Sequence, residues 1–330
     1  MDSFLDERLR VRLFGEGGRV ALRVTRMRAG LDAAAVHLVV ARGRDRRGQS
    51  VEHRYVHKVA HGPVAREAGI YRRLVHRYLP TLAPRLLHVE RPRKTVAILY
   101  LEHVPGRPWP WSELDISAAV LERIASLHEL EPDTPLPAWD YESELAGMAR
   151  WTVDMARRAT TSPARDLVRG AVPMLEDLTD RLPVMRAYLA SERPFAGRVI
   201  HGDLHPGNVM IRRLDGHADP VLIDWARTRV GSALEDLSSW AQSLATWEPE
   251  MRRRHDSLLQ RYLVARGLSP RLSTELRDLY WFAAASNALA GALGVHLEAL
   301  ADQRELDPHG PSARSARDWL RIARQARARL

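Results

Sequence analysis

Residues 198–226 read RVIHGDLHPGNVMIRRLDGHADPVLIDWA, and this stretch decides the fold. Two short apolar runs, at 199–200 and 221–223, have the β-branched character of buried strands. Polar and ionisable side chains that follow buried strands destabilise a protein unless they are paired or used. Within 24 residues the stretch carries five such side chains, which are His201, Asp203, His205, Asn208 and Asp224. The stretch therefore predicts a functional site.

The spacing of these residues is specific. His201-x-Asp203-Leu204-x-x-x-Asn208 matches the catalytic loop H-R-D-L-x-x-x-N of kinases. Asp224 follows an apolar strand and occupies the place of the D-F-G aspartate, which binds metal. The pattern predicts phosphoryl transfer.

The first hundred residues support this interpretation. Their periodicity predicts three strands, a helix and two strands, over 20–28, 34–42, 50–60, 64–77, 85–90 and 95–101. Lys58, on the third predicted strand, is one of only two lysines among 50 basic residues. A strand Lys that contacts nucleotide phosphates and pairs with a helix Glu, here Glu67, is a feature of kinases.

Beyond Trp111 the chain is predicted to be mainly helical. Helical periodicity extends over 116–130, 141–159, 164–191, 234–245, 249–266, 273–301 and 312–330. We therefore expect an α+β, bilobal, protein-kinase-like fold. Its N-terminal lobe would span residues 1–101, a hinge 102–112, and a helical C-terminal lobe 113–330, with the catalytic loop at 201–208.

HGDLHPGN followed by LIDWA resembles the aminoglycoside phosphotransferase and choline kinase superfamily of small-molecule kinases. Three further segments are similar to that family. They are the hinge-like AILYLEHVPG at 97–106, the IASLHEL helix end at 124–130, and GSALEDL at 231–237. The resemblance covers roughly residues 20 to 245.

The resemblance implies a role for each matching residue. Asp203 would accept the proton of the substrate hydroxyl, and Asn208 and Asp224 would bind Mg²⁺. Lys58, oriented by Glu67, would contact the phosphates of ATP or GTP. His201 would support the loop, His205 would face the γ-phosphate or support the loop, and the adenine would bind backbone near Glu102 and Val104.

Two departures from kinase patterns matter. No G-x-G-x-x-G occurs over the first two strands, so nucleotide cover would rest on Gly30 and the residues after it. Glu248-Pro249-Glu250 could mimic the A-P-E of protein kinases, but the segment before it reads as a packed helix. A small-molecule kinase is therefore favoured over a protein kinase.

The substrate is less well defined. An aminoglycoside-like or other antibiotic is favoured, and the alternatives are an amino sugar, a choline-like amino alcohol or a homoserine-like metabolite. Asp236 could interact with a helix dipole, brace the loop or contact substrate. The full set of candidate substrate residues is Asp236, Glu235, Trp240, Asp154 and Trp151.

Composition limits the other classes. The chain has no Cys and no run of about 18 apolar residues. No secretory signal is recognisable, so we expect a cytoplasmic protein without membrane contact. Residues 1–100 carry 21 basic and 9 acidic residues, net +12, whereas residues 101–330 carry 29 and 32, net −3. This basic third suggests nucleic acid, but no recognised motif supports it, and we expect no nucleic-acid partner.

Two further alternatives remain open. His201 and His205 could bind zinc, although a loop with Pro206 and Gly207 is not the helix such a pair normally occupies. A pseudokinase could hold nucleotide without turnover, but the set Lys58, Asp203, Asn208 and Asp224 is intact. The sequence leaves the oligomeric state open.

Overall fold

The computed structural model describes residues 4–17, 19–27, 33–106, 108, 114–162, 164–214, 217–302, 307 and 310–330. The chain forms two compact units. Unit 1 comprises residues 1–111, 132–137 and 207–228, and unit 2 comprises residues 112–131, 138–206 and 229–330. The lobe boundaries proposed from the sequence stay a prediction.

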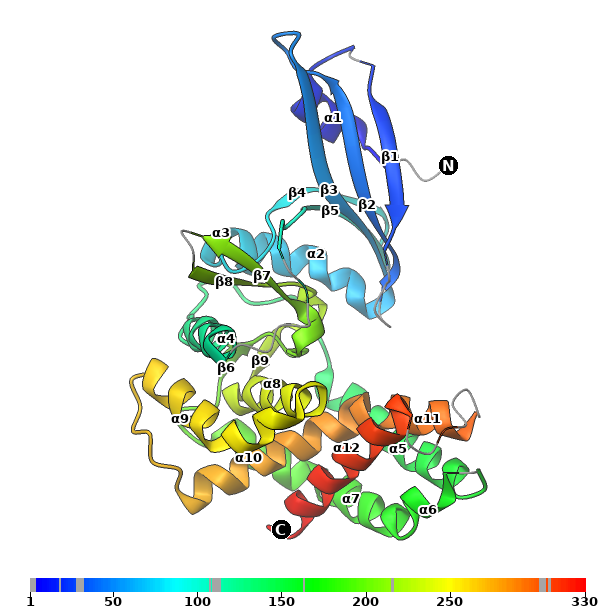
Figure 1. The fold of residues 1–330 in the computed structure, drawn as a ribbon, viewed down its shortest axis with the longest axis vertical. Coiled ribbons are helices and arrows are strands. Elements are labelled where there is room, and N and C mark those ends of the chain that lie inside the picture. Colours follow the sequence, from blue (N-terminus) through cyan, green and yellow to red (C-terminus); the bar gives the residue numbers. More distant parts are fainter. Residues whose placement is uncertain are drawn as a thin grey trace. The chain divides into compact units, whose positions relative to one another are not determined.

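Unit 1 is built on an antiparallel sheet with the strand order β1-β2-β3-β5-β4 (Figure 1). The turn between β2 and β3 is fixed by Asp45, whose side chain accepts hydrogen bonds from the backbone amides of Arg47 and Gln49. The strands lie close to the segments that their alternating sequence predicts, and are β1 (Ala21–Arg26), β2 (Ala33–Arg44), β3 (Ser50–His61), β4 (Leu86–Arg93) and β5 (Val96–Glu102).

One face of this sheet is covered by helix α1 (Glu7–Phe14), which the sequence analysis did not predict. Asp6 caps the helix by accepting hydrogen bonds from the backbone amides of Arg8 and Leu9. Leu9 and Phe14 of the helix then pack into a buried cluster with Val39, Ala41, Tyr55 and Tyr100 of the sheet.

A helical segment that follows β3 packs against β3 and β5 of the sheet. Where one helix over 64–77 was expected, the segment changes its winding along its length. It runs through η1 (Gly62–Arg66), α2 (Glu67–Ile70), η2 (Tyr71–Val75) and α3 (His76–Tyr78), which are 3₁₀, α, π and α in turn. Glu67 begins the α-helical part and is completely buried.

A hairpin follows the catalytic-loop sequence in unit 1. Strands β7 (Val209–Leu214) and β8 (His217–Leu222) pair antiparallel, with Val209 opposite Leu222 at the open end. The turn η4 (Trp225–Arg227) comes directly after Asp224. Leu222 donates a backbone hydrogen bond to Leu82, at 2.7 Å, which ties the hairpin to the rest of the unit.

Unit 2 is mainly helical, with one two-stranded ladder of β6 (Arg198–Ile200) and β9 (Arg229–Gly231) (Figure 1). Helix α5 packs on α7 and α11, and α10 packs on α7, α8 and α12. The helices are α4 (Leu114–His128), α5 (Tyr141–Ala159), α6 (Arg165–Val168), α7 (Ala171–Ser191), α8 (Ala233–Trp247), α9 (His255–Ala265), α10 (Thr274–Asn287), α11 (Leu293–Ala301) and α12 (Pro311–Arg327), with short η5 (Pro249–Arg254) and η6 (Ala288–Ala292). The short η3 (Pro206–Asn208) begins at the last residue of a unit 2 segment and continues into unit 1.

Glycines interrupt two helices that were predicted to be continuous. Gly170 has φ +69° and separates α6 from α7. Gly291 has φ +114° within η6 and separates α10 from α11. Glycine adopts such conformations without the steric penalty of a side chain. The antiparallel sheet of unit 1 and the helices of unit 2 confirm the predicted α+β class.

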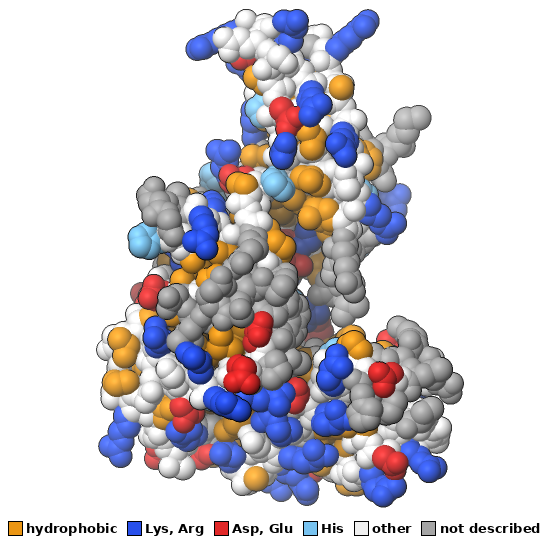
Figure 2. Space-filling model, in the orientation of Figure 1, with side chains coloured by type: hydrophobic (Ala, Val, Ile, Leu, Met, Phe, Trp, Pro, Cys, Tyr) orange, Lys and Arg blue, Asp and Glu red, His pale blue; other side chains and the backbone are white. Residues whose placement is uncertain are grey.

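On the face drawn in Figure 2, acidic side chains lie between many of the Lys and Arg side chains. Within the described residues, no helix is both long and apolar enough to cross a membrane.

Candidate active site

Lys58 lies at the centre of a buried charge cluster in unit 1. Its Nζ is 2.7 Å from Oε2 of Glu67 and 2.7 Å from Oδ1 of Asp224. The Lys58 side chain is 9% exposed, that of Glu67 is 0% and that of Asp224 is 27%, so water screens the Lys58–Glu67 pair weakly. The structure thus brings together three residues that the sequence analysis had placed in one site.

Opposing effects set the protonation of this cluster. Burial alone lowers the pKa of Lys58, but the Glu67 and Asp224 carboxylates outweigh it, so its pKa lies above the usual value. Burial raises the pKa of Glu67, and the nearby Asp224 adds to this, while Lys58 opposes it. Lys58 is therefore a fixed cation, which suits contact with phosphate.

Asp224 has an unusual backbone conformation. Its φ of 65° and ψ of 69° place it in the left-handed region, and it is the only non-glycine residue with positive φ within the described part of the chain. Such a conformation costs of order 1–3 kcal/mol in general, and persists where surrounding contacts enforce it. Strain of this kind is found preferentially at functional sites.

The residues after Asp224 supply these contacts. The backbone amide of Trp225 donates to Oε1 of Glu67 at 3.2 Å, and its indole Nε1 donates to the Leu222 carbonyl at 2.9 Å. Arg66 donates to the carbonyls of Ala226 and Thr228, at 2.9 and 2.7 Å. Glu67 therefore orients Lys58 with one oxygen and holds the turn after Asp224 with the other.

Asn208 lies at the open end of the β7–β8 hairpin and is 8% exposed. Its carbonyl accepts a hydrogen bond from the Ile223 amide at 2.9 Å. This bond sets Asn208 beside the residue that precedes Asp224. An amide oxygen and a carboxylate are hard ligands of the kind that Mg²⁺ prefers, so the donor set fits such an ion.

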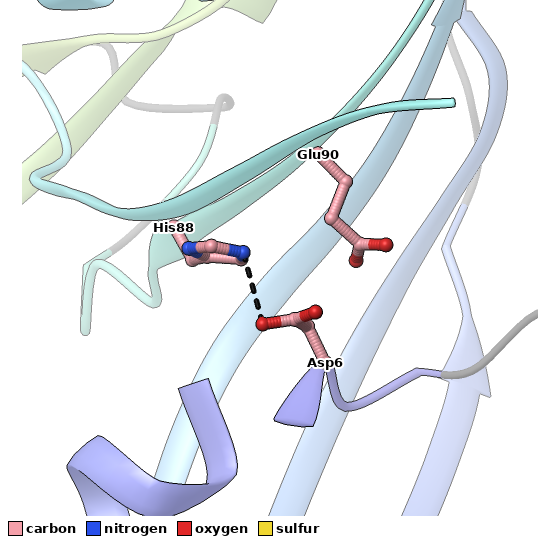
Figure 3. Close-up of side chains that lie close together, drawn as sticks. All are labelled: Asp6, His88 and Glu90. Carbon is pink, nitrogen blue, oxygen red and sulfur yellow. Dashed lines mark ion pairs between the residues drawn. The ribbon is translucent and has the colours of Figure 1, made fainter. Parts of the chain in front are cut away.

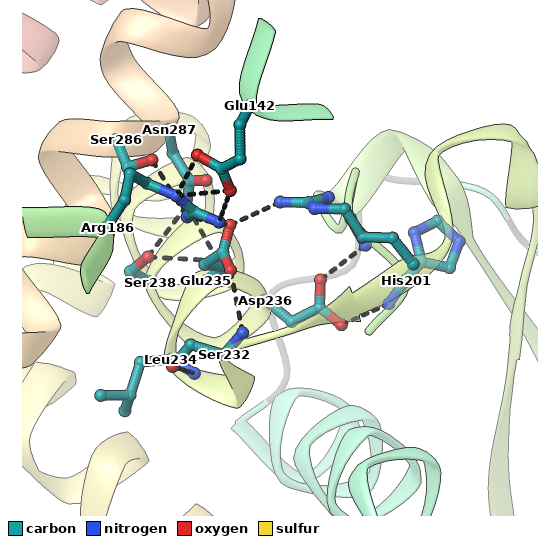
Figure 4. A network of polar contacts seen from close by, with 12 residues as sticks. Glu142, Arg186, His201, Ser232, Leu234, Glu235, Asp236, Ser238, Ser286 and Asn287 are labelled. Carbon is teal, nitrogen blue, oxygen red and sulfur yellow. Dashed lines mark hydrogen bonds and ion pairs between the residues drawn. The ribbon is translucent and has the colours of Figure 1, made fainter. Parts of the chain in front are cut away.

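In unit 2, Asp236 holds the start of the segment 201–208, which the sequence predicts to be the catalytic loop (Figure 4). Asp236 lies in the first turn of α8 and is 1% exposed. Its Oδ2 accepts from the His201 amide at 2.6 Å, and its Oδ1 accepts from the Gly202 amide at 2.8 Å. His201 is buried, whereas Asp203 and His205 are partly exposed. The zinc alternative gains no support, because within the described residues the group of possible metal ligands that was found consists of Asp6, His88 and Glu90 and includes neither His201 nor His205.

His128 completes this arrangement. Its Nε2 lies 3.1 Å from Oδ2 of Asp236 and its Nδ1 lies 2.7 Å from the Tyr262 hydroxyl. Burial lowers the pKa of His128, with Asp236 opposing the shift. Burial raises the pKa of Asp236, but His128 and the backbone amide of Gly202 lower it more. A neutral His128 then donates from Nε2 to the carboxylate and accepts from Tyr262 at Nδ1.

Glu235, next to Asp236, is bound by two arginines (Figure 4). Its Oε2 lies 2.8 Å from Arg186 and 2.5 Å from Arg229, and Oε1 accepts from the Ser232 amide at 2.9 Å. Burial raises the pKa of Glu235, but the two guanidinium groups lower it below its usual value. The Arg229 guanidinium lies 3.5 Å from the centre of the Tyr141 ring. The negative charge of Glu235 is thus neutralised within the protein.

The remaining predicted residues lie in varied surroundings. Trp240 is completely buried, Trp151 is half-buried against Gly294, and Asp154 is exposed and pairs with Arg157 at 2.8 Å. Glu102 ends β5 and donates its backbone amide to Arg85 at 2.8 Å, and Val104 follows as a buried residue. Gly30 lies outside the described residues, as do positions 107 and 109–112 of the predicted hinge.

Sequence reasoning missed Arg66, His128, Arg229 and Arg186. Arginine is so abundant here that no single one stands out, because 48 of the 50 basic residues are Arg. His128 lies within a segment noted for its family resemblance, but nothing local indicates that its partner is Asp236, 108 residues away.

Comparison with known proteins gives the family. Residues 23–279 match the model of the phosphotransferase enzyme family, and the chain belongs to that family. A search of curated proteins found no match. The chain is thus a phosphotransferase, as the resemblance implied.

Solved structures show the same protein-kinase-like fold. A putative aminoglycoside phosphotransferase from Ralstonia eutropha JMP134 is 15% identical with a TM-score of 0.59, covering 96% of each chain. An amicoumacin kinase in complex with AMP-PNP, Ca²⁺ and Ami has 16% identity and a TM-score of 0.60, covering 92% of this chain and 88% of that one. A choline kinase from Cryptosporidium parvum Iowa II has 14% identity and a TM-score of 0.59, and the match covers 93% of this chain and 89% of that one. These similarities confirm the predicted fold. The predicted enzyme class is confirmed by the family match over residues 23–279.

Proposed function

We propose that this protein transfers the γ-phosphate of ATP or GTP to a hydroxyl group of a small molecule, with Mg²⁺ as the metal. The observation that carries the proposal is the placement of Lys58 within 2.7 Å of both Glu67 and Asp224. A buried cation that is held by one carboxylate and adjoins a second is suited to bind a phosphate chain together with its metal ion.

In this proposal Lys58 contacts the α- and β-phosphates and Glu67 orients it. Asn208 and Asp224 hold Mg²⁺, which neutralises charge on the phosphates when bound. The adenine binds the backbone near Glu102 and Val104, and the segment from Gly30 covers the nucleotide. ATP is a cytoplasmic metabolite, so we place the reaction in the cytoplasm.

Asp203 would orient the substrate hydroxyl and accept its proton. A carboxylate is ionised at neutral pH and can accept a proton as the oxygen attacks phosphorus. Asp236 supports the role of the loop, because it binds the amides of His201 and Gly202 immediately before Asp203. His201 then has a supporting role, and His205 is proposed to support the loop or to face the γ-phosphate.

The substrate we propose is an aminoglycoside-like or other antibiotic, which would make the protein a resistance kinase. The second candidate is an amino sugar, a choline-like amino alcohol or a homoserine-like metabolite. Among the five candidate substrate residues, Glu235 and Asp236 already bind internal partners, and Trp240 is buried. Asp154 and Trp151 are the more accessible members of the set.

The test is a coupled ADP- or GDP-release assay in Mg²⁺. The panel contains aminoglycosides, peptide and nucleoside antibiotics, choline, homoserine and amino sugars, and the control is Asp203→Asn. We expect turnover on one class, a loss of about 10²–10⁴-fold in the control, and unchanged nucleotide binding. Asp224→Ala should in addition weaken Mg-nucleotide binding.

Wild-type turnover by Asp203→Asn would show that Asp203 is not the base. Thermal stabilisation by Mg-ATP without turnover on any acceptor would favour a nucleotide-binding role or an untested substrate. No stabilisation by either nucleotide would contradict the proposed donor.

A further inference from the structure

Asp6, His88 and Glu90 form a compact cluster in unit 1 (Figure 3). One ligand atom from each of them lies within 4.8 Å of the others. The Nε2 of His88 is 2.9 Å from Oδ1 of Asp6. Their side chains are partly buried, with 13% exposure for His88 and 19% for Asp6.

Two elements bring these residues together. His88 and Glu90 are two residues apart on β4, so both project from the same face of the sheet. Asp6 is the N-cap of α1, which covers that face. His88 lies opposite Tyr100 of β5, and Tyr100 lies opposite His57 of β3. Lys58 follows His57 and therefore projects from the other face, so the cluster is separate from the candidate active site.

The carboxylates already have supporting hydrogen bonds. The amides of Arg8 and Leu9 donate to Oδ1 of Asp6, and the Tyr100 hydroxyl donates to Oε1 of Glu90. Burial, the hydrogen bond to Glu90 and the nearby Asp6 charge raise the pKa of Tyr100, so the hydroxyl keeps its proton. Carboxylates that bind metal ions are commonly held in this way by neighbouring donors.

The charge balance at the cluster is unusual for this chain. Among the described residues, no Arg or Lys forms an ion pair with Asp6 or Glu90, although 48 residues of the sequence are Arg. Glu52 on the same sheet, in contrast, binds both Arg42 and Arg54, at 2.7 and 2.8 Å. Two neighbouring carboxylates with one imidazole and no guanidinium are suited to a cation.

We propose that Asp6, His88 and Glu90 bind a divalent transition-metal ion, with Zn²⁺ as the representative. An imidazole nitrogen favours such ions over Mg²⁺ or Ca²⁺, and Zn²⁺ accepts nitrogen and carboxylate ligands together. Tetrahedral ligands at Zn²⁺ lie about 3.3 Å apart, so small side-chain rotations close the site. Three protein ligands leave a fourth position for water.

A bound ion would link the start of α1 to β4. A ligand that binds only the folded protein stabilises it in proportion to the logarithm of its concentration above Kd. The ion would therefore stabilise unit 1 through a helix that packs on the sheet with Leu9, Leu13 and Phe14. The competing explanation is that the cluster holds no ion and that the contact between His88 and Asp6 alone joins the start of α1 to β4.

The experiment titrates Zn²⁺ into the full chain, without an affinity tag and in excess Mg²⁺ and ADP so that the candidate active site is occupied. Calorimetry measures stoichiometry, and Co²⁺ in place of Zn²⁺ gives a visible spectrum that reports the coordination. The test variants are Asp6→Asn, His88→Gln and Glu90→Gln. Asn is also a favourable N-cap, and Gln at 90 still accepts from Tyr100, so these variants retain the supporting hydrogen bonds.

Matched controls are Glu7→Gln, which follows Asp6 in the chain and has an exposed side chain that pairs with Arg10, and His53→Gln, a histidine on β3 that contacts Phe14. We expect one Zn²⁺ per wild-type chain, with affinity lower by at least about tenfold in each test variant and unchanged in the controls. Thermal midpoints should rise with Zn²⁺ only where the cluster is intact. Absence of Zn²⁺ binding by the wild type would overturn the proposal, and so would binding by the three test variants that equals binding by the wild type.

Discussion

The ammonium group of Lys58 lies 2.7 Å from a carboxylate oxygen of Asp224, although the two residues are 166 positions apart in the sequence. One comes from the middle strand of the unit 1 sheet and the other from the turn after the β7–β8 hairpin. Glu67 also forms an ion pair with Lys58, and it accepts a hydrogen bond from the backbone amide of Trp225. The position of Lys58 is therefore set by two carboxylates, one completely buried.

Glu67→Gln should lower the rate of turnover. Glutamine keeps the shape of the side chain but removes the charge that orients Lys58, and misplacement of a positioning group by about 1 Å can cost roughly 10²-fold in rate. We expect kcat/KM to fall by about that factor, measured by ADP release with the acceptor found in the panel.

Glu52→Gln is the control for this prediction, because Glu52 lies on the same strand as Lys58 but forms only surface ion pairs. Equal rates for Glu67→Gln and wild type would show that Lys58 needs no orienting carboxylate.

Asp236→Asn should lower kcat while nucleotide affinity stays the same. The substitution keeps one acceptor oxygen but weakens the charge-assisted bonds to the amides of His201 and Gly202. We expect kcat to fall about 10–100-fold, with the Kd for Mg-ATP measured by fluorescence titration. A change in Kd without a change in kcat would contradict a role in positioning the loop.

Glu235→Gln should destabilise the protein strongly. It leaves the guanidinium groups of Arg186 and Arg229 buried without their shared partner. Breaking a buried pair in this way costs about 3–5 kcal/mol, measured as the free energy of unfolding in urea. Glu142→Gln removes an exposed partner of the same Arg186 and should cost less than about 1 kcal/mol. If the two variants lost similar amounts of unfolding free energy, burial of the Glu235 ion pairs would not increase their contribution to stability.

Stability should fall as the pH is lowered below about 6.5, the usual pKa of His. The folded-state pKa of His128 is lowered chiefly by burial, so the unfolded chain binds the proton more tightly. The stabilising contribution is therefore complete above the unfolded pKa and is lost as pH falls through the lowered folded pKa.

His255, whose pKa burial also lowers, should add to this effect. The measurement is the free energy of unfolding in urea at a series of pH values, for wild type and His128→Gln. The variant should show a shallower dependence on pH. An identical slope would show that His128 does not contribute.

Local pattern predicted most elements, because strand alternation and helix periodicity depend on neighbouring residues. Helix α1 was missed since it is short and half of its eight residues are charged, and Leu9 and Phe14 gain their role only when the sheet is present. The breaks at Gly170 and Gly291 were missed for a similar reason, because apolar periodicity continues across both glycines.

For the candidate site, too, some residues were apparent from the sequence and others were not. The motif at 201–208 and Asp224 were apparent from spacing, and Lys58 from its rarity. The residues that position this motif and Asp224 were not apparent. Arg66 binds backbone carbonyls 160 and 162 positions away in the sequence, and Asp236 binds His128, which is 108 positions away. Long-range partners of this kind leave no periodic signal.

The left-handed backbone of Asp224 has a consequence for how this chain responds to selection. Glycine and asparagine adopt such a conformation more readily than aspartate, and neither carries a carboxylate. A mutant library screened for heat resistance alone should accumulate Gly or Asn at position 224. The same library screened for growth that requires the reaction should retain Asp there. Selection for stability and selection for catalysis would therefore favour different residues at position 224.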